Sequence, residues 1–275
     1  MISIIIPLYN KELFIERTLN SVLNQTYKDF EIILINDGST DQSAAIVKKH
    51  KDVRIKYIEQ TNHGVSATRN HGIKLSSGEF ISFLDADDIW HPQFLERLYT
   101  LSLDYPDYSF FCCAQKNRII PNLPMGISII EDHCKYDYIY CTGCSIIRRS
   151  IFEEIGGFRE GVQLGEDRDM WLKIGCKYHT VYINEELIFH PETTEGNLSR
   201  IIDVSRSFPY WEWFSYPYPI KKSLYKYTNK MLISNAKILV NQKRYKDAWF
   251  FLKKCKRLYA IKTRIELLYR IIFRD

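Results

Sequence analysis

In the N-terminal third of the chain, hydrophobic positions alternate between two spacings. Short β-branched runs give way to stretches in which apolar residues recur every three or four positions, so the runs predict strands and the stretches predict amphipathic helices. We expect strands over Ser3–Leu8, Glu31–Asn36, Val53–Glu59 and from Phe80, and helices over Glu12–Leu23, Gln42–His50 and Gly64–Ser76. Strands that alternate with helices through short loops indicate an α/β fold with a mostly parallel central sheet flanked by helices.

The pattern is less regular after Pro92. We expect helices to about Leu103, over Ile151–Ile155 and over Glu166–Lys177, and strands over Tyr108–Cys112, Val181–Ile183 and Leu187–Phe189. Between Gln115 and Tyr138 no period is clear, and we interpret this segment as an excursion over the sheet where a second substrate could be held. Three helical segments are expected at the end: Ile220 to about Val240, Tyr245–Leu258 and Thr263–Phe273. We divide the chain into an α/β domain over residues 1–215 and a basic helical C-terminal extension over residues 216–275.

Composition changes this picture little. Hydrophobic residues make up 45% of the chain and charged residues 26%, as in ordinary globular proteins. There is no apolar run long enough for a membrane-spanning helix, and Met1 leads directly into a strand pattern without the features of a signal peptide. We therefore expect a cytoplasmic protein whose seven cysteines stay reduced.

Charge is distributed unevenly. Residues 220–275 hold sixteen Lys and Arg against three acids, a net charge of +13, whereas the rest of the chain carries −8. This asymmetry favours an anionic partner for the extension, either as a cationic surface on the inner face of a membrane or as nucleic acid. Because no nucleic-acid recognition motif accompanies the charge, we do not expect nucleic acid. A helical hairpin that packs on the body with a solvated basic face is the alternative.

Three carboxylates follow the strand that starts at Phe80. Asp85, Asp87 and Asp88 fall within four positions, and like charges this close repel each other unless they share a cation. Carboxylate oxygens suit Mg²⁺ or Mn²⁺, and ligands of open parallel sheets bind beyond the carboxyl ends of the strands. A solvated acidic turn before the helix that Pro92 opens would explain the same residues. The local sequence does not decide between the two.

Asp37 ends the second predicted strand, at the same edge of the sheet. It could accept hydrogen bonds from a nucleobase imide or a ribose hydroxyl, or it could cap the next helix. Neither a dinucleotide-binding glycine pattern nor a phosphate-binding loop follows the first strand, so phosphates would have to be held by a metal.

Two further clusters allow more than one interpretation. Glu166 and Asp167 start a predicted helix, where acids favour the helix dipole, but a carboxylate there could also act as a general base. Cys141-x-x-Cys144, with Cys112, Cys113 and Cys134 upstream, is a weak zinc pattern, because it has no spaced second pair. Ordinary reduced thiols are the favoured interpretation.

Five motifs in order resemble glycosyltransferase family 2 with the GT-A fold, over about Met1 to His190. They are Ser3 to Asn10, Asn36-Asp37-Gly38-Ser39-Thr40-Asp41, Gly64-Val65-Ser66-Ala67-Thr68-Arg69-Asn70, Leu84-Asp85-Ala86-Asp87-Asp88, and Gly156-Gly157-Phe158 with Gly165-Glu166-Asp167. The resemblance implies inverting transfer of a sugar from a nucleotide-diphosphate donor, usually a UDP-sugar, with Mn²⁺ or Mg²⁺. The acceptor would be a hydroxyl of a glycan or of a lipid-linked molecule, in cell-surface polysaccharide synthesis. The Gln-x-x-Arg-Trp motif of processive members is missing, so we expect a single sugar per encounter.

The resemblance also assigns roles to individual residues. For the donor, Pro7 and Tyr9 would line the base pocket, Asp37 would bind uracil, Arg69 would support the base or diphosphate, and Asp85 would meet the ribose.

For the chemistry, Asp87 would ligate the metal that bridges the phosphates. Asp167 would be the base for the acceptor hydroxyl, with Glu166 beside it. His190 sits where some relatives have a third metal ligand, although a turn residue before Pro191 explains it as well.

Two alternatives compete with this function. A sugar nucleotidyltransferase would need a glycine-rich, basic loop after the first strand, which Pro7 to Lys11 lacks. A non-catalytic nucleotide-sugar-binding scaffold at the membrane surface would need neither a metal ligand nor a base, so Asp87 and Asp167 together argue against it.

Overall fold

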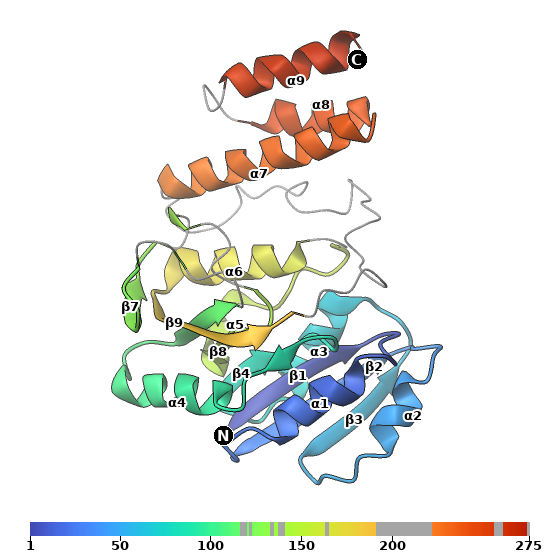
Figure 1. The fold of residues 1–275 in the computed structure, drawn as a ribbon, viewed down its shortest axis with the longest axis vertical. Coiled ribbons are helices and arrows are strands. Elements are labelled where there is room, and N and C mark those ends of the chain that lie inside the picture. Colours follow the sequence, from blue (N-terminus) through green and yellow to red (C-terminus); the bar gives the residue numbers. More distant parts are fainter. Residues whose placement is uncertain are drawn as a thin grey trace.

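The β-branched runs form the middle of a mixed sheet in the computed structural model, which describes residues 1–115, 120, 123–132, 135–136, 141–162, 165–190, 222–255 and 261–273. The strands in these ranges are β1 (Ile2–Leu8), β2 (Phe30–Asp37), β3 (Ile55–Gln60), β4 (Phe80–Phe83), β5 (Ile89–Trp90), β6 (Phe110–Gln115), β7 (Ile127–Ile130), β8 (Ser145–Arg148) and β9 (Thr180–Phe189). They join one sheet in the order β3-β2-β1-β4-β8-β6-β9-β5, and β7 pairs with β9 (Figure 1).

Parallel pairing confirms the predicted fold class and places the site. β1 pairs in parallel with both β2 and β4, and Ile5 lies opposite Ile33 on one side and Phe83 on the other. β3 extends the same parallel block beside β2. The carboxyl ends of these strands therefore meet at one edge, which is where Asp37 and the acid loop 84–88 emerge.

Helices cover both faces of the sheet. They are α1 (Ile15–Leu23), α2 (Ser43–Lys48), α3 (Val65–Leu75), α4 (Phe94–Asp104), α5 (Arg149–Ile155) and α6 (Glu166–Lys177). Side chains alternate between the faces of a strand, so Ile4 and Ile6 pack in one apolar cluster with α1 and α4. Ile5 packs in the other cluster, with α5 and α6.

Close approach of α3 to β1 depends on Gly72. A Cβ at this position would overlap the side chain of Ile5, which is fully buried. The absence of a side chain therefore sets how near the helix lies to the central strand.

The sequence pattern missed three short strands and divided one long strand into two. The segment from Gln115 to Tyr138 contains β7, and β8 precedes α5; both are short strands whose partners are distant in sequence. The predicted strand from Phe80 is confirmed as β4, which ends at Phe83, and Ile89–Trp90 forms a further strand against β9 that was not predicted. The two strands predicted after α6 are one, β9, which continues through a polar middle section because β6 pairs with it across register shifts.

Three helices follow outside the sheet: α7 (Lys222–Asn241), α8 (Tyr245–Lys254) and α9 (Ile261–Phe273). They share an apolar cluster of their own, in which Ala236, Phe251 and Leu267 are buried. Figure 1 shows α7 nearest to the sheet and α9 at the far end of the molecule. The domain boundary that we place between residues 215 and 216 lies outside the described residues and stays a prediction. Among the helices described, none is both long and apolar enough to cross a bilayer.

Candidate active site

Asp37 holds the loop between β3 and α3. Its side chain is 3% exposed, and Oδ1 accepts hydrogen bonds from Gln60 Nε2 at 2.8 Å and the His63 backbone N–H at 2.9 Å. Oδ2 accepts the Gly64 backbone N–H, also at 2.9 Å. A carboxylate oxygen has two lone pairs, so Oδ2 keeps one for a further donor. Asp37 thus shapes the loop in the structure, and its predicted contact with uracil stays a prediction.

The loop after β1 is tied to the loop after β2. Asn10 adopts a left-handed backbone conformation with φ 50°, and its Oδ1 accepts the Thr40 backbone N–H at 2.8 Å. Tyr9, just before it, is 45% exposed, and Pro7 pairs with β2 inside β1. Asn10 lies in the first of the five sequence motifs, where it has no assigned role; its signal is an Asn where the strand pattern stops, since Asn tolerates this conformation better than most residues.

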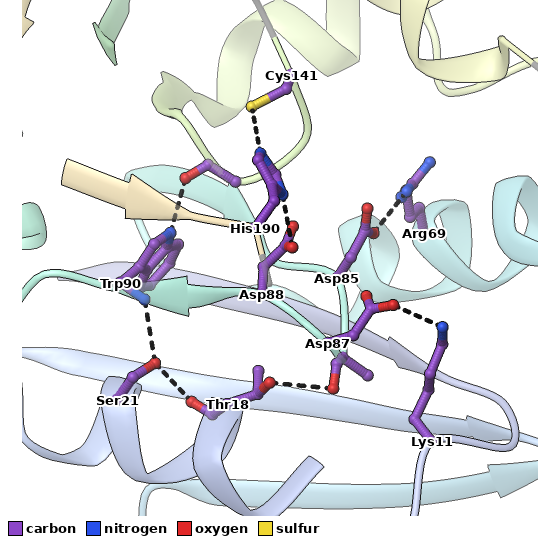
Figure 2. Close-up of polar contacts among 12 residues, drawn as sticks. Lys11, Thr18, Ser21, Arg69, Asp85, Asp87, Asp88, Trp90, Cys141 and His190 are labelled. Atoms are coloured by element: carbon purple, nitrogen blue, oxygen red, sulfur yellow. Dashed lines mark hydrogen bonds and ion pairs between the residues drawn. The ribbon is translucent and has the colours of Figure 1, made fainter. Parts of the chain in front are cut away.

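Arg69 joins the acid loop to the start of α6. The guanidinium is 3% exposed, and it donates through Nη2 to Asp85 Oδ1 at 2.7 Å (Figure 2). Through Nη1 it donates to Glu166 Oε1, also at 2.7 Å. Its other neighbour is the Phe158 ring, with the guanidinium carbon 5.2 Å from the ring centroid. A buried guanidinium requires opposite charges close by, so the two carboxylates and Arg69 fix one another.

The two carboxylates at the start of α6 differ in environment. Burial raises the pKa of Glu166 and the neighbouring charge of Asp167 adds to this, whereas Arg69 opposes it. Asp167 is half-exposed, and its Oδ1 accepts the Arg168 backbone N–H at 2.8 Å. The sequence therefore brings together a buried carboxylate that Arg69 holds and an accessible one beside it.

Asp87 already faces a cation. Lys11 Nζ, from the loop after β1, lies 2.6 Å from Asp87 Oδ2, and the two side chains are 20% and 28% exposed (Figure 2). The position of this ammonium shows that Asp87 can receive positive charge, which fits the predicted metal ligand. Within the described residues, no group of three or more His, Cys, Asp and Glu side chains surrounds one metal position. A metal would therefore complete its shell with phosphate and water oxygens.

His190 is directed at Asp88. Its Nδ1 lies 2.6 Å from Asp88 Oδ1, and its Nε2 lies 3.5 Å from Cys141 Sγ (Figure 2). Burial raises the pKa of Asp88 to about 7 although His190 opposes the shift. The Asp88 carboxylate in turn raises the pKa of His190 against the effect of burial. Only Nε2 of His190 could still face a metal, and its role as a ligand stays a prediction.

Cys112, Cys141 and Cys144 form a thiol cluster, with Cys113 next to Cys112 in the chain. Cys112 Sγ and Cys144 Sγ lie 3.2 Å apart, and Cys112 and Cys113 are fully buried. Burial raises the pKa of both these thiols, which keeps them protonated and unreactive. Cys134 lies outside the described residues, and the described ones include no metal-binding group, so the geometry gives the zinc interpretation no support.

Known structures share this fold. Staphylococcus aureus TarS in complex with UDP superposes with a TM-score of 0.72 at 20% identity, covering 100% of this chain and 87% of that one. The mannosyltransferase PcManGT from Pyrobaculum calidifontis, solved with GDP-Man and Mn²⁺, superposes with a TM-score of 0.61 at 15% identity, covering 100% and 75%. The mixed sheet with flanking helices is thus that of GT-A glycosyltransferases.

Sequence comparison reaches closer relatives. The glycosyltransferase EpsJ of Bacillus subtilis, itself uncharacterized, is 46% identical over 219 residues, which is 73% of this chain and 63% of EpsJ. Glycosyltransferase GlyA of Streptococcus pneumoniae is 43% identical over 106 residues, or 38% of this chain and 15% of GlyA. The chain thus spans less than two thirds of the length of these relatives. The model of the family "Glycosyl transferase family 2" matches residues 3–156, which include Asp37, Arg69 and the acid loop. The chain belongs to glycosyltransferase family 2.

Proposed function

We propose that the chain is an inverting, non-processive glycosyltransferase that moves one sugar from a UDP-sugar to a hydroxyl of a glycan or lipid-linked acceptor. The observation that carries the proposal is the Arg69 bridge, because it holds Asp85 and Glu166 in one site although they are far apart in sequence. Donor complexes of structures with this fold support the donor class: TarS with UDP and UDP-GlcNAc, and PcManGT with GDP-Man.

In the proposed reaction, the carboxylates at the sheet edge bind the donor. Asp37 accepts a hydrogen bond from the base through its remaining lone pair, and Asp85 accepts one from the ribose. Arg69 keeps Asp85 oriented through the 2.7 Å contact. Asp87 would hold Mn²⁺ or Mg²⁺, which stabilises the negative charge of the leaving diphosphate.

Asp167 supplies the base. Its half-exposed carboxylate takes the proton of the acceptor hydroxyl as the hydroxyl oxygen attacks the anomeric carbon. Attack from the face opposite the diphosphate inverts the configuration. Glu166 cannot take this role while it remains in its ion pair with Arg69.

We place the reaction in cell-surface polysaccharide synthesis, at the cytoplasmic face of a membrane. The basic extension, with its net charge of +13, supports this placement because the inner leaflet carries anionic lipid.

A melting experiment tests the donor class. The purified chain is heated with UDP, GDP, CDP or dTDP, each with and without Mn²⁺, because a ligand of the native state raises the melting temperature. We expect a shift with UDP that is larger with Mn²⁺. A shift with GDP alone would mean that the donor is a GDP-sugar and not a UDP-sugar. No shift with any nucleotide would overturn the proposal.

A further inference from the structure

Helix α9 carries an exposed apolar stripe. Ile265, Tyr269 and Ile272 are 61%, 55% and 65% exposed, and their spacing places them on one face of the helix. On another face, Leu267 is buried in the cluster that the three C-terminal helices share. The side chains of the stripe therefore take no part in the apolar cluster that holds the three C-terminal helices together.

Helix α8 adds an exposed aromatic side chain next to the end of this stripe. Trp249 is 40% exposed, and it lines a groove of about 710 Å³ together with Ile271 and Ile272 of α9. Lys243 and Lys246 line the same groove. Lys253 is exposed as well, and its Nζ lies 5.2 Å from the centroid of the Trp249 ring. Large apolar side chains and lysine ammonium groups thus line the same groove, and the one acid among the described residues that line it, Asp247, is paired with Arg244.

Charge decides what such a surface can contact. Residues 220–275 carry a net charge of +13, so the same face of a second copy of the chain would add a like charge and be repelled. Anionic lipid attracts the charge and also offers an apolar layer at the depth of the headgroups. Trp and Tyr favour that depth, and lysines reach from it to the phosphates.

We propose that the face formed by Trp249, Ile265, Tyr269 and Ile272 rests on an anionic lipid surface, with Lys243, Lys246 and Lys253 at the headgroups. This deepens the proposed placement of the enzyme at a membrane by naming the contacting face. Because α9 lies at the end of the molecule away from the sheet, the contact leaves the acid loop uncovered (Figure 1).

Vesicle cosedimentation of the full chain tests the proposal without donor or acceptor. We expect binding to vesicles of phosphatidylcholine mixed with phosphatidylglycerol, and little binding to phosphatidylcholine alone. The double variant Ile265→Ser with Ile272→Ser removes exposed side chains only, and it should lower binding roughly tenfold. Lys243→Glu with Lys246→Glu should lower it at least as much. Leu103→Ser, at a 62% exposed position on α4, is the matched control and should bind like the parent.

A second readout locates the contact. Bromine-labelled lipid should quench tryptophan fluorescence in the parent, and Trp249→Phe should remove that quenching. Equal binding by the parent and the Ile265/Ile272 variant would overturn the proposal, as would equal binding to both vesicle types. Self-association of the chain that the same variant abolishes would assign the face to a second copy and overturn it too.

The proposed function and this proposal fail separately. If no nucleotide shifts the melting temperature but the vesicle results hold, the lipid face stands and the donor assignment fails. If the Ile265/Ile272 variant keeps the helical circular dichroism of the parent, its C-terminal helices are intact, and its vesicle binding then reports on the face alone.

Discussion

Individual carboxylates of the site have different surroundings, and these predict different effects of substitution. Asp167 is half-exposed and accepts one local hydrogen bond, so Asn should fit in its place. We expect Asp167→Asn to lower kcat about 100- to 10,000-fold, as loss of a general base does, and to leave the UDP-dependent melting shift unchanged. Transfer at the parent rate would contradict the assignment. Asp87→Ala serves as the comparison, because it should remove the effect of Mn²⁺ on the melting shift.

Lys11 competes with metal for Asp87 if Asp87 is the metal ligand. Its ammonium lies 2.6 Å from Asp87 Oδ2 in a partly exposed pair, which is worth up to about 1 kcal/mol. Lys11→Met should therefore tighten binding of Mn²⁺ alone up to roughly fivefold. Electron paramagnetic resonance of Mn²⁺ measures this affinity without nucleotide. Lys49→Met, at the exposed position directly after α2, is the control. Unchanged affinity would show that Lys11 does not hold the metal position.

The sequence predicted the position of those site residues that local pattern places, but not the contacts between residues that are far apart in the chain. Asp37, Asp85, Asp87 and Glu166 follow strands or start a helix, so their placement could be inferred from local pattern and motif. Lys11 could not, because its partner Asp87 is 76 positions away. The same holds for the contact of His190 with Asp88, which spans 102 positions.

At the scale of elements, Glu31 links three strands and a loop. Its carboxylate accepts hydrogen bonds from Ser3 Oγ at 2.6 Å and from the Ser77 backbone N–H at 2.8 Å, and it pairs with Lys56 on β3. Burial alone would raise the pKa of Glu31, but these donors outweigh it and lower the pKa to about 2.

This depressed pKa predicts an acid-dependent loss of stability. The folded state holds the ionised form more tightly than the unfolded state, so the stabilisation is complete above the ordinary pKa of 4.5 and disappears as the pH falls toward 2. We expect it to be on the order of 2 kcal/mol, with the exposed Lys56 discounted for solvent screening. In urea unfolding between about pH 6 and 3, the free energy of unfolding should fall less steeply with decreasing pH in Glu31→Gln than in the parent. Parallel pH profiles of parent and variant would refute this role.

Gly72 predicts a packing effect between two elements. An alanine Cβ would overlap Ile5 in the buried layer between α3 and β1, and such overpacking costs about 1–3 kcal/mol. Alanine regains up to about 1 kcal/mol as a better helix former, so Gly72→Ala should lose about 1–2 kcal/mol of unfolding free energy. Chemical denaturation checks this, and Lys74→Ala, at an exposed position of the same helix, should be nearly neutral. A stabilised Gly72→Ala would mean that Ile5 moves aside freely.

Strands differed in how far the sequence predicted them. β1, β2 and β4 are rich in apolar residues and buried along nearly their whole length, and their pattern alone identifies them. β5 and β8 are short, and β7 exposes apolar residues such as Ile127, so their formation depends on partners elsewhere in the chain. The continuity of β9 likewise depends on β6. Non-local pairing of this kind leaves little trace in a local sequence pattern.

At the scale of the whole molecule, the sheet and the C-terminal helices have separate apolar clusters, so nucleotide binding and lipid binding should be separable. The sheet clusters and the cluster of α7, α8 and α9 have no residue in common. We expect a chain ending at residue 221 to keep its nucleotide-dependent melting shift and to lose binding to anionic vesicles. Loss of the melting shift would show that the C-terminal helices support the donor site.

The Arg69 bridge has a consequence for how this protein can change over generations. Replacing Arg69 alone would leave Asp85 and Glu166 with unbalanced charge, and replacing either acid would leave a buried guanidinium half-satisfied. Each single substitution therefore destabilises the protein by more than the lost ion pair alone, because it leaves an unpaired charge. Replacing all three residues together leaves no such charge. Among descendants of a common ancestor, we expect positions 69, 85 and 166 to be inherited as one set, preserved or exchanged together.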